Sequence, residues 1–84
     1  MLFTVELVVE GKPVAKDPEG ETIMRDLMHA HGFPQVSKVR SATLYRITLE
    51  AKSAGDAKAI VEKMNTQLRL ANPVAQNFTI TVRQ

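Results

Sequence analysis

The chain has 84 residues, of which eleven are lysine or arginine, nine are aspartate or glutamate and none is cysteine. This length allows one small domain, residues 1–84, whose limited core commonly gains stability by oligomerisation. The lack of cysteine excludes a disulfide framework and a thiolate metal site, and a net charge of +2 gives no support to nucleic-acid binding. Because no apolar run approaches the roughly 20 residues that span a bilayer, and the N-terminus does not resemble a signal peptide, we expect a cytoplasmic protein without membrane contact.

The first third of the sequence predicts a strand followed by a helix. Residues 2–10 alternate between apolar and polar side chains, which is typical of a strand with one buried face. Asp17 is placed to cap a helix N-terminus, and Pro18 fits the first helical position. An apolar stripe at helical spacing follows, and Gly32 is a suitable C-terminal stop. We therefore expect a helix at residues 18–31.

Gly20 is unusual because it lies in the first turn of this predicted helix. Glycine is less favourable than alanine in a helix by about 0.5–1 kcal/mol. Its presence predicts either an irregular first turn or a close approach at this position, by another part of the chain or by the backbone of a partner protein.

The remainder of the sequence predicts further strands and a second helix. Residues 36–51 are strand-like, and we expect two strands, Val36–Arg40 and Leu44–Glu50, with one long bent strand as the alternative. Ser53 and Asp56 form a capping box that begins a second amphipathic helix, which we expect Pro73 to end. Residues 78–82 alternate again and predict a last strand.

The resulting order, βαββαβ, predicts an α+β fold. Strands with one apolar face and two amphipathic helices indicate a two-layer α/β plait, with both helices on one face of an antiparallel sheet. On the other face we expect Glu6 and Arg46 to pair across strands.

The sequence gives no pattern typical of a catalytic, cofactor or metal site. His29 and His31 are two residues apart on a helix and so point to different sides, which favours surface histidines. We also considered RNA binding, because βαββαβ is the topology of the RNA-recognition motif. That module stacks bases on sheet aromatics, whereas Tyr45 and Phe78 fall on the apolar faces of their strands here. We therefore expect no catalytic residue, no bound cofactor or metal and no nucleic-acid partner.

Three segments carry a resemblance to a known family. They are Lys12-Pro13 followed by Asp17-Pro18-Glu19-Gly20, the pair Val39-Arg40, and the run Leu70-Ala71-Asn72-Pro73-Val74. In spacing and over nearly the whole chain they resemble the PurS-type small subunit of phosphoribosylformylglycinamidine synthase. The sequence departs from the pattern of that family in two connecting regions, at Val14, Lys16, Ser41 and Ala42.

The resemblance implies a non-catalytic subunit of a glutamine-dependent C–N ligase of purine biosynthesis. In that enzyme a glutaminase subunit releases ammonia and a large synthetase subunit consumes ATP with Mg, so this chain would bridge the two and assist ammonia transfer. The resemblance also implies a homodimer or a higher homo-oligomer. The alternative is a ligand-sensing regulatory plait domain. Our candidate interface residues are Asp17, Pro18, Gly20, Arg40, Arg46, Asn72 and Pro73.

Overall fold

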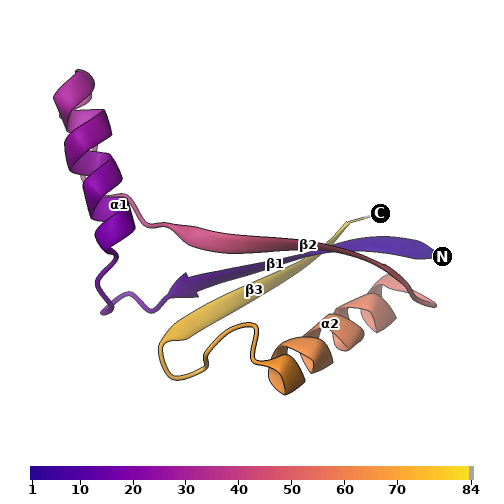
Figure 1. The fold of residues 1–84 in the computed structure, drawn as a ribbon. Coiled ribbons are helices and arrows are strands. Elements are labelled where there is room, and N and C mark those ends of the chain that lie inside the picture. The colour runs from indigo at the N-terminus through magenta and orange to yellow at the C-terminus, as the bar shows by residue number, and fades with distance from the viewer. Residues whose placement is uncertain (84) are drawn as a thin grey trace.

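A three-stranded antiparallel sheet is the centre of the computed structural model, which describes residues 1–83 (Figure 1). Strand β1 (Leu2–Gly11) lies between β2 (Ala42–Glu50) and β3 (Gln76–Arg83). The register places Glu6 opposite Arg46 on one side and Thr81 on the other. The predicted α+β plait with an antiparallel sheet is confirmed, although this sheet has three strands and not the four of a βαββαβ order.

Helix α2 (Ala54–Leu68) covers one face of the sheet and forms the core with it. The predicted capping box begins this helix, because the Ser53 hydroxyl accepts from the Asp56 amide at 3.1 Å. Alternation in β1 turns every second side chain toward α2, since successive residues of a strand point to opposite faces. The buried apolar side chains are Phe3, Val5, Leu7, Val9, Ala51, Ala57, Val61 and Ala71.

The end of α2 differs from the prediction. Arg69, and not Pro73, ends the helix, with a left-handed backbone at φ 53° and its amide bonded to the Asn65 carbonyl. Pro73 lies four residues further along, in the loop that leads to β3. An arginine gave no sequence signal for this stop, because left-handed caps are usually glycine or asparagine.

The predicted helix at residues 18–31 is confirmed with the same bounds. It is continuous but changes its winding, from α1 (Pro18–Thr22) through the π-wound η1 (Ile23–Met28) to the 3₁₀-wound η2 (His29–His31). Gly32 stops it with a left-handed φ of 99°, as expected. We refer to residues 18–31 as the helical arm.

Residues 33–41 return along the helical arm and do not form the predicted strand Val36–Arg40. The His29 imidazole lies 2.7 Å from the Val36 carbonyl oxygen, so this return segment is joined to the helix and not to the sheet. The pairing of β2 with β1 starts at Ala42 opposite Glu10. The predicted strand Leu44–Glu50 is confirmed as part of β2. The predicted strand Val36–Arg40, and the alternative of one long bent strand, are wrong, because β1 has almost ended at this point and offers no further pairing partner.

The helical arm projects beyond the end of the sheet, whereas we expected both helices to cover one face (Figure 1). Only α2 packs on the sheet. The chain measures 49 × 28 × 14 Å, and its Cα radius of gyration is 16.2 Å, whereas a compact 84-residue domain would have about 12 Å. Within residues 1–83, no helix has the length and apolar character needed to cross a membrane.

Candidate partner interface

The base of the helical arm is fixed by the Asp17 carboxylate. Its Oδ1 accepts from the Gly20 amide at 3.1 Å and from the Ser41 hydroxyl at 2.8 Å, and its Oδ2 accepts from the Ser41 amide. The predicted N-cap is thus confirmed, and the same carboxylate also ties the helix to the start of β2. We call Asp17, Gly20, Arg40 and Ser41 the helix-base cluster.

These hydrogen bonds hold the pKa of Asp17 below its usual range. The Ser41 amide contributes most, followed by the Gly20 amide and the Ser41 hydroxyl, and the charge of Arg40 acts in the same direction. Each of these donors favours the charged carboxylate. At neutral pH the cluster therefore contains an ionised Asp17.

Gly20 is buried against the return segment, so the close approach predicted for it occurs within the chain. A Cβ built on Gly20 would lie 2.3 Å from the Val39 carbonyl oxygen and 3.0 Å from Asp17 Oδ2. No side chain fits that space without movement of the backbone at Val39. Pro18, in contrast, is an exposed residue of the first helical turn, as its fixed φ favours.

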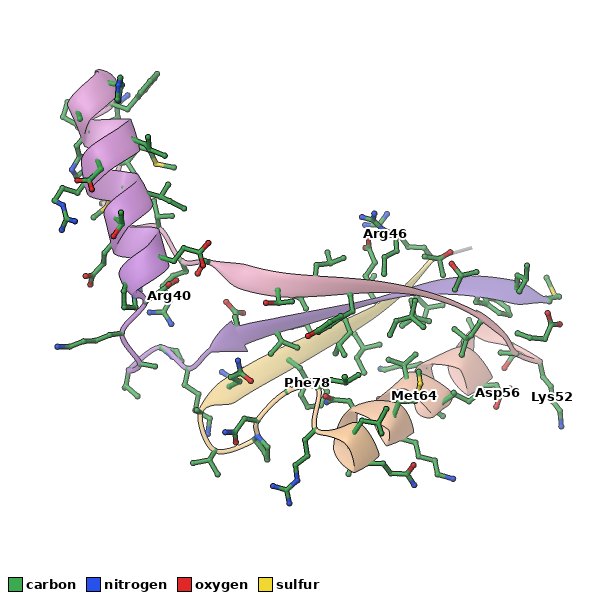
Figure 2. All side chains as sticks on the ribbon, viewed as in Figure 1. Arg40, Arg46, Lys52, Asp56, Met64 and Phe78 are labelled. Carbon is green, nitrogen blue, oxygen red and sulfur yellow. The ribbon has the colours of Figure 1, made fainter. Side chains whose placement is uncertain are left out.

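Arg40 organises the loop between β1 and the helical arm. Its guanidinium donates to the carbonyl oxygens of Ala15 at 2.7 Å, Gly11 at 3.1 Å and Lys12 at 3.1 Å. Figure 2 places this side chain at the foot of the arm. Because three carbonyls of one loop converge on one cation, Arg40 fixes the path of the chain as it leaves the sheet.

The expected pair of Glu6 and Arg46 is confirmed on the sheet face away from α2. Arg46 Nε donates to Glu6 Oε2 at 3.1 Å, and Arg83 Nε donates to Glu6 Oε1 at 2.6 Å. The Glu6 side chain is 11% exposed, whereas the two arginines are 64% and 65% exposed. The hydrogen bonds of Arg83 and then Arg46 lower the pKa of Glu6. This face therefore presents two guanidinium groups held over one buried carboxylate. Figure 2 shows Arg46 on the side of the sheet away from α2.

Asn72 builds the tight turn between α2 and β3. Its side-chain oxygen accepts from the Val74 amide at 3.0 Å, and its carbonyl oxygen accepts from the Gln76 amide at 2.8 Å. Pro73 is exposed in the same turn, and Val74 is 82% exposed. The turn is joined to the first loop, because the Lys12 amide donates to the Ala75 carbonyl at 3.1 Å.

Six of the seven candidate residues thus gather at the end of the sheet where β1 stops. Residues 11–17, 36–42 and 69–76 meet there, and we call this region the loop end (Figure 1). Val14 is the most exposed of the large apolar residues, at 94%. Arg46 is the exception and lies on the sheet face away from α2. Contact of these residues with a partner stays a prediction.

Three residues with well-defined roles were not among the candidates. Ser41 carries two contacts of the helix-base cluster, although the sequence marked it only as a departure from the family pattern. Arg83 had a usable signal, because the alternation in the last strand places it on the face of Glu6. Arg69 carried no sequence signal, because left-handed helix caps are usually glycine or asparagine.

Three carboxylates of the described residues are held in structural contacts. Asp17, Glu6 and Asp56 accept hydrogen bonds from backbone or arginine donors. Both histidines are exposed, in agreement with the prediction, and their rings contact the carbonyl oxygens of Val36 and Leu27. In residues 1–83 no group of three histidine, cysteine or carboxylate side chains is arranged to hold a metal ion.

Comparison with known proteins identifies the family. Residues 4–84 match the family model described as PurS, phosphoribosylformylglycinamidine (FGAM) synthase. A PurS subunit of this synthase from Archaeoglobus fulgidus is 37% identical over 79 residues, which cover 94% of this chain and 96% of that one. The structure of PurLQS from Thermotoga maritima contains a chain that is 32% identical, with a TM-score of 0.87 and coverage of 99% of both chains. The PurS structure from Methanocaldococcus jannaschii is 30% identical, with a TM-score of 0.85 and coverage of 98% of this chain and 96% of that one. The chain therefore belongs to the PurS family and is a subunit of FGAM synthase, an enzyme of purine biosynthesis.

Proposed function

We propose that this chain is a non-catalytic subunit that bridges the glutaminase and synthetase subunits of the enzyme in the cytoplasm. The observation that carries the proposal is the elongated shape, with a helical arm that projects from one end of the sheet (Figure 1). A bridging subunit needs separate surfaces for separate partners, and an axis of 49 Å provides them. The PurLQS structure from T. maritima, whose relevant chain matches this one over 99% of its length, supports assembly into such a complex.

The contribution of this chain to the reaction would be positioning. Ammonia released into solvent is diluted and protonated, and its protonated form is not a nucleophile. Holding two active sites together and excluding water preserves the reactive form. The proposal assigns ATP and Mg to the rest of the complex. The engagement of Asp17 and Glu6 in structural hydrogen bonds supports a non-catalytic role for this chain, because neither carboxylate is available as an acid or a base.

The loop end is the proposed contact surface for another subunit. Val14 and Val74 are 94% and 82% exposed, so both apolar side chains are available to a partner. The loops that carry them are fixed by Arg40 and Asn72, so little conformational freedom would be lost on binding. A rigid apolar surface of this kind favours association.

The bridging proposal predicts that a substitution in the loop end weakens the complex of the three subunits. The chain would be mixed with the glutaminase and synthetase subunits, Mg-ADP and glutamine, and followed by sedimentation and by glutamine-dependent synthesis. Val74→Asp should weaken the complex and lower glutamine-dependent activity, while activity with added ammonia persists. Leu2→Asp is the matched control, because Leu2 is 66% exposed at the opposite end of β1. Full coupling of the other two subunits in the absence of this chain would refute the bridging role.

We further propose that a second copy of the chain covers the helical arm. Leu27 is 59% exposed on the apolar side of the arm, and Phe33, just beyond it, is 55% exposed. The sheet face beside α2 is also partly uncovered, with Tyr45 at 40% and Phe78 at 48% exposure. Two apolar surfaces on the same chain, neither covered within it, favour mutual burial in a symmetric homo-oligomer.

The oligomeric state tests this second proposal. Sedimentation velocity of the purified chain should give a dimer or a larger species, and Leu27→Asp should shift it toward the monomer. Thr22→Asp is the control, because it adds the same charge at another exposed position of the arm. An unchanged mass for Leu27→Asp would show that the arm is not the interface.

A further inference from the structure

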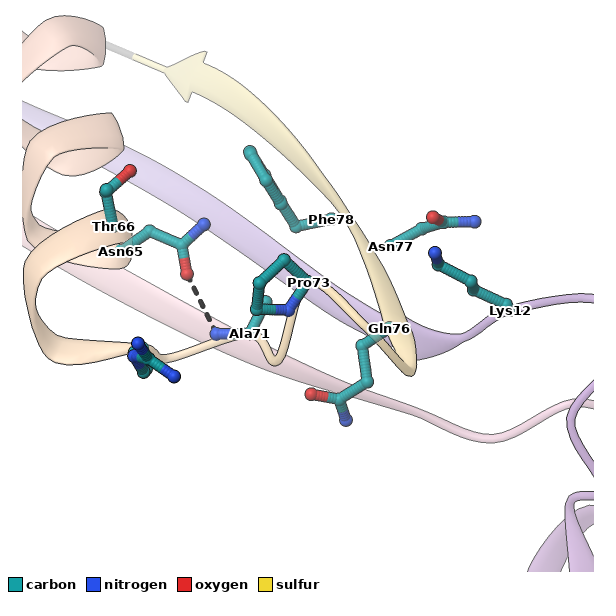
Figure 3. Close-up of a pocket in the computed structure, with 9 residues that line it drawn as sticks. Lys12, Asn65, Thr66, Ala71, Pro73, Gln76, Asn77 and Phe78 are labelled. Atoms are coloured by element: carbon teal, nitrogen blue, oxygen red, sulfur yellow. Dashed lines mark hydrogen bonds between the residues drawn. The ribbon is translucent and has the colours of Figure 1, made fainter.

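A pocket of about 560 Å³ lies between the C-terminal end of α2, the following loop and β3 (Figure 3). Phe78 and Pro73 form apolar parts of its wall, and Asn65, Arg69 and Lys12 also line it. The volume is within the usual range of about 300–1,000 Å³ for small-molecule sites. Five of the lining residues, Lys12, Arg69, Ala71, Pro73 and Gln76, belong to the loop end, so the pocket opens on the surface proposed for contact with another subunit.

The charge of the pocket is positive. Lys12 and Arg69 line it, and no aspartate or glutamate does. Neither cation forms an ion pair with another group in residues 1–83. The dipole of α2 places about half a negative charge at its C-terminal end, which disfavours an anion. The two full positive charges of Lys12 and Arg69 exceed it. The net field therefore favours a negatively charged ligand.

Two of the three amide side chains that line the pocket, those of Asn65 and Gln76, are oriented as donors. The Asn65 side chain, whose residue is only 4% exposed, accepts from the Ala71 amide through its oxygen at 2.8 Å (Figure 3). The Gln76 side-chain oxygen accepts from the Asn72 amide at 2.8 Å. Because both oxygens are occupied, the groups left for a ligand are the two NH₂ groups. Two amide donors and two cations suit the oxygens of a phosphate or a carboxylate.

Arg69 occupies the pocket wall at a conformational cost. Its φ of 53° is left-handed, a region that is unfavourable for residues other than glycine. Glycine would end the helix without that cost. The presence of an arginine at this position in spite of that cost supports a role for its guanidinium group in the pocket.

We propose that this pocket binds a small organic anion, with its phosphate or carboxylate held by Lys12, Arg69 and the Asn65 amide and its planar or apolar part against Phe78. The exposed ring of Phe78 offers an aromatic face for that part. The site would give the chain a ligand-dependent state in addition to its bridging role.

The test is a titration of the full chain followed by backbone amide NMR shifts. The probes are ADP and benzoate, which combine an anion with a planar body, and inorganic phosphate and adenosine, which each supply one half. ADP or benzoate should shift the amides of Asn65, Arg69 and Phe78 at lower concentration than either half alone. Absence of shifts at these residues with every probe up to about 10 mM would overturn the proposal, since weaker binding has no use in a cell.

Three variants distinguish a built site from general charge attraction. Arg69→Gly removes the guanidinium and relieves the backbone, and Lys12→Gln removes the other cation; each should weaken binding about tenfold or more, as expected for a lost charge-assisted hydrogen bond. Lys63→Gln, on an exposed position of α2 outside the pocket, should leave affinity within about twofold. Equal weakening by all three would refute the site. Shifts caused only by the synthetase or glutaminase subunit would identify the occupant as a partner side chain and would also overturn the proposal.

Discussion

Substitution of Gly20 by alanine tests whether the base of the helical arm is closely packed. A Cβ at this position would lie 2.3 Å from the Val39 carbonyl oxygen, whereas ordinary contact begins near 3.4 Å, so the return segment must move by about 1 Å. Val39 is two residues from Ser41, whose bonds to Asp17 would lengthen with that movement. Alanine gains about 0.5–1 kcal/mol in helix propensity, but backbone overpacking costs about 1–3 kcal/mol. We therefore expect a net loss of about 1–2 kcal/mol.

The measurement is urea unfolding by circular dichroism at one fixed protein concentration, because oligomerisation makes stability depend on concentration. Gly55→Ala is the matched control, since Gly55 also lies in a first helical turn and the nearest atom to its added Cβ is 3.9 Å away. This control should gain about 0.5–1 kcal/mol. If Gly20→Ala is stabilised as much as Gly55→Ala, the close packing against Val39 is refuted.

Three further substitutions address other parts of the structure. The pKa of Glu6 is lowered chiefly by its hydrogen bond with Arg83, so its contribution to stability is present above the unfolded pKa and is lost as pH falls through the folded pKa. Glu6→Gln should therefore reduce the dependence of the urea unfolding midpoint on pH in the acid range. Asn65→Ala leaves the buried amide of Ala71 without its acceptor and should cost about 1–3 kcal/mol, whereas Asn65→Asp retains the acceptor. Arg69→Gly should raise the melting temperature by several degrees, for a gain of about 1 kcal/mol, and Arg69→Ala should not.

Local signals predicted the elements that depend on local chemistry. The alternation of β1, the Asp17 cap, the Gly32 stop and the capping box at Ser53 all act within a few residues, and each was confirmed. The pair of Glu6 with Arg46 was also predictable, because a period of two places both on the outer sheet face. The same alternation places Arg83 on this face, but its contact with Glu6 is diagonal and depends on the register of β3, which no sequence pattern fixes.

Features that depend on partners in space were not predictable. Residues 36–40 have strand-like composition, but a strand needs a neighbour, and β1 ends at Gly11. The direction of the helical arm depends on Arg40 and on the Asp17–Ser41 contacts, which join segments more than twenty residues apart. Of the candidate site, the sequence indicated the residues of the loop end but not the contacts that gather them.

In the helical arm, the residues that fix its direction differ from the residues that are exposed to a partner. Polar contacts at its base, made by Asp17 and Arg40, fix its direction within the chain. The apolar side of the arm is left exposed at Leu27. A flexible arm would lose conformational entropy on association, and a fixed one loses much less. A chain whose polar contacts fix the direction of the arm and whose apolar surface stays exposed is therefore suited to hold other subunits in a set geometry, as the proposed transfer of ammonia between two active sites requires.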